Sequence, residues 1–448
     1  MPIKTLHITN AYHAKSGGIS TFYRALLSAG NRSERLMRLV VPGKKTMVEE
    51  VGQFGRIYHI AAPNAPIFDR RYSMLLPHTY MPPFRGALWR ILKEEQPDLV
   101  DVCDKYALNW LGGFLRRDWI PGVKRPVVVG MSCERMDDNV RAFVTGRELG
   151  RRWSRFYLSY CYIPLFDYHI ANSQYTADEL LEAMVSPHNR PVFVRPMGAE
   201  VEDCANANRS GKERQKLLEL CGGHHATKLL IYAGRLSPEK NIPLLIEMME
   251  KLAGDRNPDY RLLVAGSGPL ADQLENEAQK RVPGLVCALG HISDRADLIN
   301  LYANCDVFVH PNPREPFGIA PLEAMAAGLP LVAPGSGGVL SYADETNAWL
   351  AKADAAAFAG AVRSIFTNQA ICRDKLARAR WTAQRYSWNS ATAQFFELYD
   401  HLYHEKSSHC QSPASSWPDA DQHYRSRSLG YSRRPDRRSG SRGVARQG

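Results

Sequence analysis

Two glutamates eight residues apart, Glu315 and Glu323, bracket a segment whose backbone must be irregular. Pro316 pushes Glu315 out of helical geometry. Pro321 suits the first position of a helix that we predict over Leu322–Ala327, with Glu323 in its first turn. One carboxylate is therefore expected on a loop and the other at a helix start, at the lip of one strand-to-helix junction, where open α/β sheets bind ligands. The alternative for Glu323 is a helix-capping acid.

Two cations, Arg235 and Lys240, follow another predicted strand, Leu229–Ala233. Ser237 suits the cap of the next helix, which we predict over Pro238–Leu252. Both cations can then converge on a helix N-terminus with free N–H groups, an arrangement that favours a diphosphate site without a metal. Two ordinary surface cations near a helix cap are the alternative.

Three further loops follow predicted strands of the same series. They carry Gly266 in the turn Gly-Ser-Gly-Pro, Ile292 and Asp294 in Gly-His-Ile-Ser-Asp, and His310 ahead of Glu315. Parallel strands bring such loops to one edge of a sheet, so these residues should converge. That convergence is stronger evidence than any single motif, since glycine is common in ordinary turns of this kind.

The sheets that must position these loops are visible as short, continuous apolar runs, which are typical of strands covered on both faces. In the first half we predict strands at Ile3–Thr9, Leu36–Val41, Ile57–Ala61, Leu99–Val102, Val127–Met131, Tyr168–Ala171 and Val192–Val194. Helical patterns between them include Thr21–Ser28, Gly86–Glu95 and Thr176–Met184.

A second alternation begins at Lys228, after a polar, linker-like stretch at Asn206–Glu213. Its predicted strands are Leu229–Ala233, Arg261–Ala265, Leu285–Leu289, Val307–His310 and Leu331–Ala333. Its helices are Pro238–Leu252, Leu270–Gln279, Ala296–Tyr302, Leu322–Ala327 and Ala355–Phe366, and Trp388–Tyr403 is amphipathic. The pattern predicts an α/β protein with two doubly wound, Rossmann-like sheets.

Composition limits the class of protein. The 448 residues are 44% hydrophobic and 23% charged, a composition typical of globular proteins. No run approaches the ~20 apolar residues of a membrane span. The nine cysteines form no Cys-x-x-Cys pair and the N-terminus lacks a secretory pattern, so we expect a cytoplasmic protein. Much of the net charge of +11 lies in a Ser/Arg-rich end, which weakens a nucleic-acid role.

These motifs resemble glycosyltransferase family 4, whose members are retaining nucleotide-sugar glycosyltransferases. The resemblance rests on Glu315-x7-Glu323, on Gly234-Arg-Leu-Ser-Pro-Glu-Lys-Asn241, on the Gly-Ser-Gly-Pro turn and on Leu289-Gly-His-Ile-Ser-Asp294. It implies the GT-B architecture, in which two Rossmann-like domains face a central cleft. We expect an acceptor-side domain at 1–197, a nucleotide-sugar domain at 198–384, a helix at 385–404 that crosses back, and a disordered basic tail at 405–448.

The resemblance also implies roles for single residues. Arg235 and Lys240 would hold the donor diphosphate, Glu323 would accept the ribose hydroxyls, and Glu315 would accept hydroxyls of the donor sugar. The backbone around Phe317, Gly318 and Ile319 would surround the donor sugar. Ile292 would contact the base through its backbone, with Asp294 nearby.

In the first half, Gly17 and Gly18 follow the first strand and permit positive φ, so their loop can approach a phosphate or sugar. Family members have such a loop over the donor; an ordinary strand-to-helix turn is the alternative. Many members also carry a His after a middle strand of this domain, where we place Cys133. Cysteine cannot replace that ring. Either the expected position lies a few residues away, or Glu134 or a backbone group takes over. Cys133 as a covalent nucleophile is the least favoured alternative.

The segment from Gly146 to Tyr162 combines arginines with aromatic residues. Such a helix can contact anionic lipid or a lipid-linked acceptor. A structural helix that packs its aromatic side chains inward is the commoner case, and it is the alternative that we favour from sequence alone.

The expected activity is transfer of a hexose, with mannose favoured, from a GDP- or UDP-sugar to a hydroxyl acceptor in surface polysaccharide or glycolipid synthesis. No metal or other cofactor is expected, and the expected location is cytoplasmic with peripheral contact at the membrane. A non-catalytic nucleotide-sugar-binding or scaffold protein is the second hypothesis, favoured by Cys133. A nucleic-acid protein, resting on the tail, is a third and disfavoured one.

Overall fold

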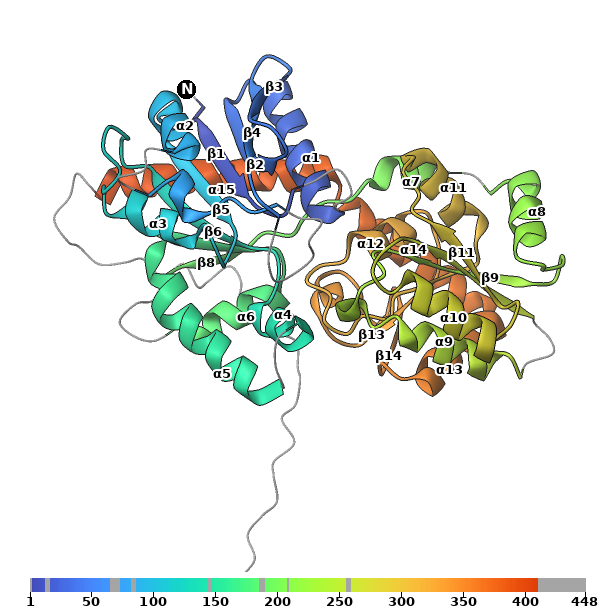
Figure 1. Cartoon of the computed structure of the whole chain (residues 1–448). Coiled ribbons are helices and arrows are strands. Elements are labelled where there is room, and N and C mark those ends of the chain that lie inside the picture. The colour runs from blue at the N-terminus through green and yellow to red at the C-terminus, as the bar shows by residue number, and fades with distance from the viewer. Residues whose placement is uncertain are drawn as a thin grey trace, which may run out of the picture. The chain divides into compact units, whose positions relative to one another are not determined.

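The computed structural model describes residues 2–12, 17–64, 73–81, 86–143, 147–184, 190–207, 209–254 and 259–409. Two mainly parallel sheets with helices on their faces organise this chain (Figure 1), as the alternating pattern predicted.

The first sheet has eight strands in the order β3-β4-β2-β1-β5-β6-β7-β8, and all neighbours are parallel except β3 and β4. Its strands are β1 (Thr5–Thr9), β2 (Met37–Gly43), β3 (Met47–Val51), β4 (Gly55–Ala61), β5 (Leu99–Cys103), β6 (Val127–Ser132), β7 (Tyr168–Ala171) and β8 (Val192–Val194). Its helices are α1 (Gly18–Arg32), α2 (Ala87–Glu95), α3 (Asn109–Arg116), α4 (Met136–Phe143), α5 (Arg147–Tyr157) and α6 (Gln174–Ala183).

The second sheet has six parallel strands in the order β11-β10-β9-β12-β13-β14. They are β9 (Lys228–Ala233), β10 (Tyr260–Ala265), β11 (Val286–Gly290), β12 (Val307–Val309), β13 (Leu331–Pro334) and β14 (Trp349–Ala351). The helices are α7 (Val201–Asn206), α8 (Gly211–Leu220), α9 (Pro243–Leu252), α10 (Ala271–Arg281), α11 (Arg295–Asn304), α12 (Ile319–Ala326), α13 (Ala355–Thr367) and α14 (Gln369–Gln384).

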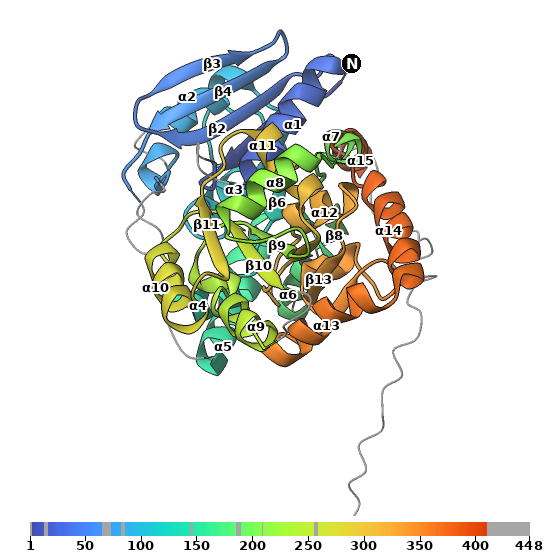
Figure 2. The same ribbon diagram turned by 90° about the vertical axis from the view of Figure 1, so that its right-hand side faces the viewer.

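Helices cover both faces of this second sheet, which explains why its strands are continuously apolar. Leu230 and Tyr232 of β9 pack with α9, α10 and α13, whereas Leu229 and Ile231 pack with α11, α12 and α14 (Figure 1 and Figure 2). With every residue from Leu229 to Ala233 buried, no polar alternation is tolerated along the strand.

The last helix, α15 (Trp388–His409), packs on the first sheet. The ring of Phe395 lies 4.9 Å from that of Phe22 in α1, and the Tyr399 hydroxyl donates to Asp101 Oδ2 of β5 at 2.7 Å. The helix continues through His409, so the prediction of disorder from residue 405 is wrong for residues 405–409. Residues 410–448 lie outside the described residues.

Several boundaries differ from the sequence-based expectation. The linker predicted at Asn206–Glu213 contains the end of α7 and the start of α8, which Ser210 caps by accepting from the Glu213 N–H at 3.4 Å. The strands β3 and β14 and the helices α3 and α14 were not predicted. Among the described helices, none is long and apolar enough to cross a membrane.

Candidate active site

The order of the second sheet reverses between β9 and β12, which are hydrogen-bonded neighbours. The loops that leave these two strands run to opposite faces, and ligands of open α/β sheets bind in the crevice outside the strand ends at such a point. Arg235 and Lys240 follow β9, and Glu315 follows β12. The topology therefore brings together the cations and the first glutamate that sequence analysis selected.

Glu315 is 9% exposed and is held by several donors. The Lys240 ammonium donates to Oε1 at 3.0 Å and to Oε2 at 2.8 Å, and Asn312 Nδ2 donates to Oε2 at 3.0 Å. Burial alone would raise the pKa of Glu315, but the charge of Lys240 and these hydrogen bonds outweigh burial and lower the pKa to about 2. At neutral pH Glu315 is an ionised hydrogen-bond acceptor.

The segment that carries Lys240 differs from the predicted helix start. Pro238–Lys240 forms only the 3-10 turn η4, Asn241 adopts a left-handed conformation with φ of 56°, and α9 begins at Pro243. The Ser237 side chain makes no capping hydrogen bond; its hydroxyl donates instead to Glu239 Oε1 at 2.5 Å. The predicted N-terminus of a long helix at Ser237 is therefore wrong.

Arg235 also leaves β9 toward this turn. Its guanidinium donates to Glu239 Oε1 at 2.5 Å, and its carbonyl accepts from the Tyr232 hydroxyl at 3.0 Å. Burial would raise the pKa of Glu239, yet Arg235 and the Ser237 hydroxyl lower it. Each of the two cations thus has a carboxylate partner in this structure, Glu239 for Arg235 and Glu315 for Lys240.

Glu323 lies deeper than expected along its helix. Because α12 begins at Ile319, Pro321 is its third residue and Glu323 its fifth, not a first-turn residue. The glutamate is 2% exposed and forms an ion pair with Arg295 of α11. Burial raises the pKa of Glu323 although Arg295 opposes the rise. Its position excludes the interpretation that Glu323 caps the N-terminus of α12.

The turn between the two glutamates is fixed by Gly318. This residue has φ of 88°, which favours glycine, and its carbonyl accepts from the Tyr342 hydroxyl at 2.5 Å. Phe317 is buried with its ring 5.4 Å from that of Tyr342. Ile319 opens α12. The backbone from Phe317 to Ile319 is therefore held in place by the contacts of Phe317 and Gly318 with Tyr342 and by the start of α12.

The other two loops of this edge show a structural reason for their motifs. A Cβ at Gly266 would lie 1.9 Å from the Gly234 carbonyl oxygen, so Gly266 lets the β10 loop pack on the β9 loop. Asp294 accepts from the N–H groups of Ala296 and Asp297, at 2.7 Å and 3.4 Å, and so caps α11. Ile292 is partly buried just before this cap.

The first-domain glycines behave differently from expectation. Gly17 has φ of −78° and precedes α1, and Gly18 is its first residue; neither uses the positive φ that the sequence left open. A Cβ on Gly18 would lie 2.8 Å from Ile319 Cδ1. The start of α1 therefore approaches the start of α12, which places the Gly-Gly turn beside the Glu315–Glu323 segment.

Cys133 is buried and packs against Cys103, with 3.5 Å between the two sulfur atoms. The hydrogen bond that Cys133 shares with Cys103 and burial raise the pKa of the Cys133 thiol, which disfavours the thiolate that a nucleophile needs. Burial also raises the pKa of Glu134, opposed by the charges of Lys105 and Arg235.

Further contacts join the second-domain loops after β9 and β12 to helix α4 of the first domain. Arg314 Nε lies 3.3 Å from Asp138 Oδ1 of α4, and α4 also packs against η4. Three residues that hold the predicted ones in place were not predicted from the sequence: Arg295, Asn312 and Tyr342. Asn312 stands three residues before Glu315 and could have been suspected, whereas Arg295 and Tyr342 carry no local signal.

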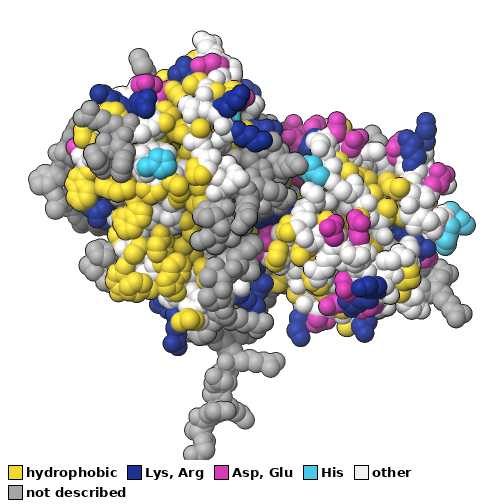
Figure 3. Space-filling model, viewed as in Figure 1, with side chains coloured by type: hydrophobic (Ala, Val, Ile, Leu, Met, Phe, Trp, Pro, Cys, Tyr) yellow, Lys and Arg dark blue, Asp and Glu magenta, His cyan; other side chains and the backbone are white. Residues whose placement is uncertain are grey.

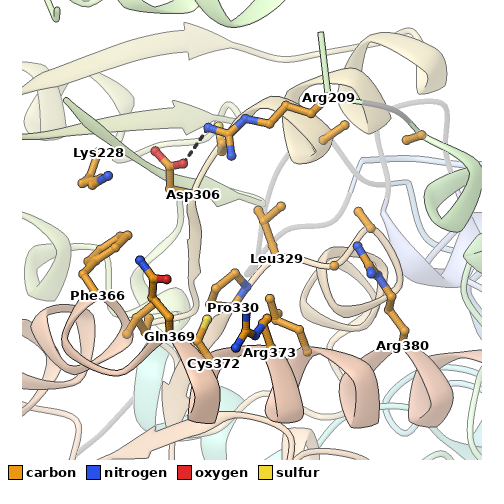
Figure 4. Close-up of a pocket in the computed structure, with 17 residues that line it drawn as sticks. Arg209, Lys228, Asp306, Leu329, Pro330, Phe366, Gln369, Cys372, Arg373 and Arg380 are labelled. Atoms are coloured by element: carbon orange, nitrogen blue, oxygen red, sulfur yellow. Dashed lines mark hydrogen bonds and ion pairs between the residues drawn. The ribbon is translucent and has the colours of Figure 1, made fainter. Parts of the chain in front are cut away.

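A cavity of about 650 Å³ lies elsewhere in the second domain, at the edge where the strands begin. Its walls include Lys228, the first residue of β9, and Asp306, which directly precedes β12. They also include Arg373 and Arg380, whose side chains extend from α14 (Figure 4). None of the predicted site residues lines it, so the candidate site is the crevice at the opposite edge. Among the described residues no cluster of three or more His, Cys, Asp or Glu side chains has the arrangement of a metal site.

Comparison with protein families gives two matches. Residues 17–202 match the model described as Glycosyltransferase Family 4, and residues 223–386 match Glycosyl transferases group 1. The second match contains the crevice with Lys240, Glu315 and Glu323.

Two curated relatives match over most of the chain. The GDP-mannose-dependent alpha-(1-6)-phosphatidylinositol dimannoside mannosyltransferase of Mycobacterium tuberculosis is 28% identical over 405 residues, covering 87% of this chain and 94% of the relative. The alpha-monoglucosyldiacylglycerol synthase of Streptococcus pneumoniae is 24% identical over 334 residues, covering 73% and 70%.

Solved structures share the fold. Sucrose-phosphate synthase from Thermosynechococcus elongatus matches with a TM-score of 0.71 and 19% identity, covering 90% of this chain and 100% of that one. Anabaena HepE in complex with UDP and glucose matches with a TM-score of 0.63 and 18% identity, covering 89% and 100%. At these identities the likeness shows the GT-B architecture alone.

Proposed function

We propose that this chain, which belongs to glycosyltransferase family 4, moves a hexose from a nucleotide diphosphate sugar to a hydroxyl acceptor with retention of the anomeric configuration. Membership supports a glycosyltransferase that acts on nucleotide sugars. The observation that carries the finer proposal is the Lys240–Glu315 pair at the strand-order reversal, where a cation for phosphate meets an acceptor for sugar hydroxyls.

Glu315 is proposed to orient the donor sugar. A carboxylate whose pKa is about 2 stays ionised at neutral pH, so it accepts hydrogen bonds and does not donate a proton. Its oxygens are already placed by Lys240 and Asn312, which lowers the entropy lost when sugar hydroxyls bind. Glu323, ion-paired with Arg295, is proposed to accept the ribose hydroxyls from the neighbouring helix.

Arg235 and Lys240 are proposed to stabilise the leaving diphosphate. Both residues lie in the loop after β9. Arg235 is paired with Glu239, a carboxylate that a diphosphate could replace as hydrogen-bond acceptor, and Lys240 can contact a diphosphate while it holds Glu315. The departing phosphate oxygen would draw the proton of the acceptor hydroxyl on the same face of the sugar, so no protein nucleophile is needed. This agrees with the buried Cys133 thiol, and the two cations would supply the charge that a divalent metal supplies elsewhere.

For the donor we favour GDP-mannose, because the mycobacterial relative that covers 87% of this chain is GDP-mannose-dependent. For the acceptor we favour a glycolipid, since phosphatidylinositol dimannoside and diacylglycerol appear in the names of two relatives. Surface polysaccharide is the second possibility. The enzyme would then work in the cytoplasm, in peripheral contact with the membrane.

The test is turnover of a panel of GDP-, UDP- and ADP-sugars by the purified chain beside Glu315→Gln. We expect one donor to be consumed, with turnover reduced by about 100-fold or more in Glu315→Gln, because an orienting charge is lost in a buried site. Glu250→Gln, an exposed acid of α9 paired with Arg281, is the matched control and should keep full turnover.

Two outcomes would contradict this proposal. Equal turnover by wild type and Glu315→Gln would remove Glu315 from the site. Tight binding of a nucleoside diphosphate without turnover, with any lipid or saccharide acceptor supplied, would favour the non-catalytic binding protein.

A further inference from the structure

The outer face of α5 carries a stripe of large apolar side chains, which we define as Leu149, Trp153, Phe156 and Tyr160. Their exposed fractions are 71%, 52%, 61% and 59%. Large hydrophobic residues are normally exposed singly, so four in one row require an explanation. The aromatic side chains of this segment divide: Tyr157 and Tyr162 pack inward, as the sequence favoured, whereas Phe156 and Tyr160 face outward.

Helical geometry makes these residues a continuous stripe. Steps of four, three and four residues keep side chains on one face of a helix, and the stripe runs from α5 into the π-helical turn η2 (Leu158–Tyr162). The rings of Phe156 and Tyr160 lie 4.9 Å apart. Figure 3 shows hydrophobic side chains gathered over the part of the first domain where Figure 1 draws α5.

The opposite face anchors the helix to the domain. Ser154, Leu158 and Ser159 are buried, and the Ser159 hydroxyl donates to the Ala183 carbonyl of α6 at 2.5 Å. The Tyr157 hydroxyl donates to the Lys105 carbonyl at 2.9 Å. Because these contacts fix the rotation of the helix, the stripe cannot turn inward without breaking them.

One arginine borders the stripe and a second lies beyond it. Around the helix, Arg152 lies next to the stripe, and Arg155 lies beyond Arg152 in the direction of the buried Leu158; both arginines are exposed. The segment from Arg147 to Tyr160 contains four arginines and one glutamate. An apolar band with tryptophan and tyrosine beside a cationic band is the pattern of a helix that lies in the surface of an anionic bilayer.

We propose that the α5 stripe docks this protein on an anionic lipid bilayer, with Leu149, Trp153, Phe156 and Tyr160 entering the headgroup boundary and Arg152 and Arg155 contacting lipid phosphates. Charge complementarity selects this occupant, because a cationic border next to exposed rings suits anionic headgroups better than an apolar protein surface. This inference rests on the proposed function in one respect, because an enzyme held at the bilayer by the α5 stripe can reach a lipid acceptor.

The test is binding of the full chain, without any nucleotide sugar, to vesicles of equal parts phosphatidylcholine and phosphatidylglycerol. We expect co-sedimentation with these vesicles and little with phosphatidylcholine alone. Trp153→Ser combined with Phe156→Ser should weaken binding by about tenfold or more. Arg152→Gln combined with Arg155→Gln should weaken it by roughly fivefold for each arginine and reduce its salt dependence.

Trp381→Ser is the matched control, because Trp381 is 60% exposed but lies on α14 of the second domain. It should bind vesicles as the wild type does. Since the stripe is exposed, the double serine variant should keep the wild-type circular dichroism spectrum, which separates lost docking from lost folding.

Three results would overturn the proposal. They are absence of binding to the anionic vesicles, equal binding by the serine variant, and a wild-type dimer that the serine substitutions convert to monomer, which would make the stripe a contact between two copies. Vesicle binding without sugar transfer would leave this proposal standing and refute the proposed activity instead.

Discussion

Replacing Asp101 by Asn should change how the stability of the first domain depends on pH. Asp101 lies fully buried in β5, where Oδ2 accepts from the Tyr399 hydroxyl and Oδ1 has no hydrogen-bond partner among the described residues. His7 Nδ1 is 3.9 Å away, but burial lowers the pKa of His7 to about 3, so its ring is neutral. Burial therefore raises the pKa of Asp101 to about 7, although Tyr399 opposes the rise.

The sign follows from the two pKa values of Asp101. Below the unfolded pKa of 3.8 the proton is bound in both states, and Asp101 costs nothing. Between that value and 7 only the unfolded chain releases the proton, so the free energy of unfolding falls by about 1.4 kcal/mol for each pH unit. The full loss is about 4 kcal/mol above pH 7, and about 3 kcal/mol of it accrues from pH 5 upward.

The assay is urea unfolding of wild type and Asp101→Asn at a series of pH values from 5 to 8, followed by circular dichroism. Taking the difference between variant and wild type at each pH removes the groups that titrate in both. Asparagine still accepts from Tyr399 but cannot ionise, so the difference should shift in favour of the variant by about 3 kcal/mol across this range.

Glu95→Gln is the control for this experiment. Burial would raise the pKa of Glu95, but hydrogen bonds from Tyr58, Arg38 and Lys4 lower it, so its stabilising contribution is lost only below its ordinary range. Its difference from wild type should stay nearly constant between pH 5 and 8. Two results would refute the argument that the buried Asp101 carboxyl beside α15 lacks a compensating charge. They are a difference in unfolding free energy between Asp101→Asn and wild type that stays constant with pH, and one that shifts toward wild type as the pH rises.

Three other substitutions or conditions test the site. Arg235→Ala should lower turnover by about 100-fold or more while the circular dichroism spectrum stays unchanged, and a normal rate would remove Arg235 from diphosphate binding. Turnover should persist in excess EDTA, and strict loss would contradict charge stabilisation by Arg235 and Lys240 alone. Gly266→Ala should lower the free energy of unfolding by about 2 kcal/mol or more, because its Cβ would meet the Gly234 carbonyl oxygen. Gly254→Ala is the control and should have little effect, because the space around its Cβ is open. Equal effects of the two substitutions on the free energy of unfolding would refute the packing argument.

Local sequence patterns determined most of the secondary structure. Tyr168–Ala171 and Val192–Val194 are strands with the predicted ends, because a short continuous apolar run between polar turns has few other conformations that bury it. The edge strand β3 was not predicted, since residues Met47–Glu50 are exposed and leave no apolar pattern. The long helix predicted from Pro238 was wrong because Asn241 takes a left-handed conformation that proline and serine signals do not encode.

For the candidate site, the sequence by itself determined which residue types could bind a diphosphate and a sugar, because Glu315, Lys240 and Arg235 each belong to the segment that follows a recognisable strand. Only the tertiary structure decided their partners. The Lys240–Glu315 pair spans 75 residues, and Glu323 meets Arg295 from a different helix. It likewise decided that Trp153 and Phe156 face outward, because a helical pattern fixes which residues share a face but the packing of Ser154 and Leu158 determines which side is buried.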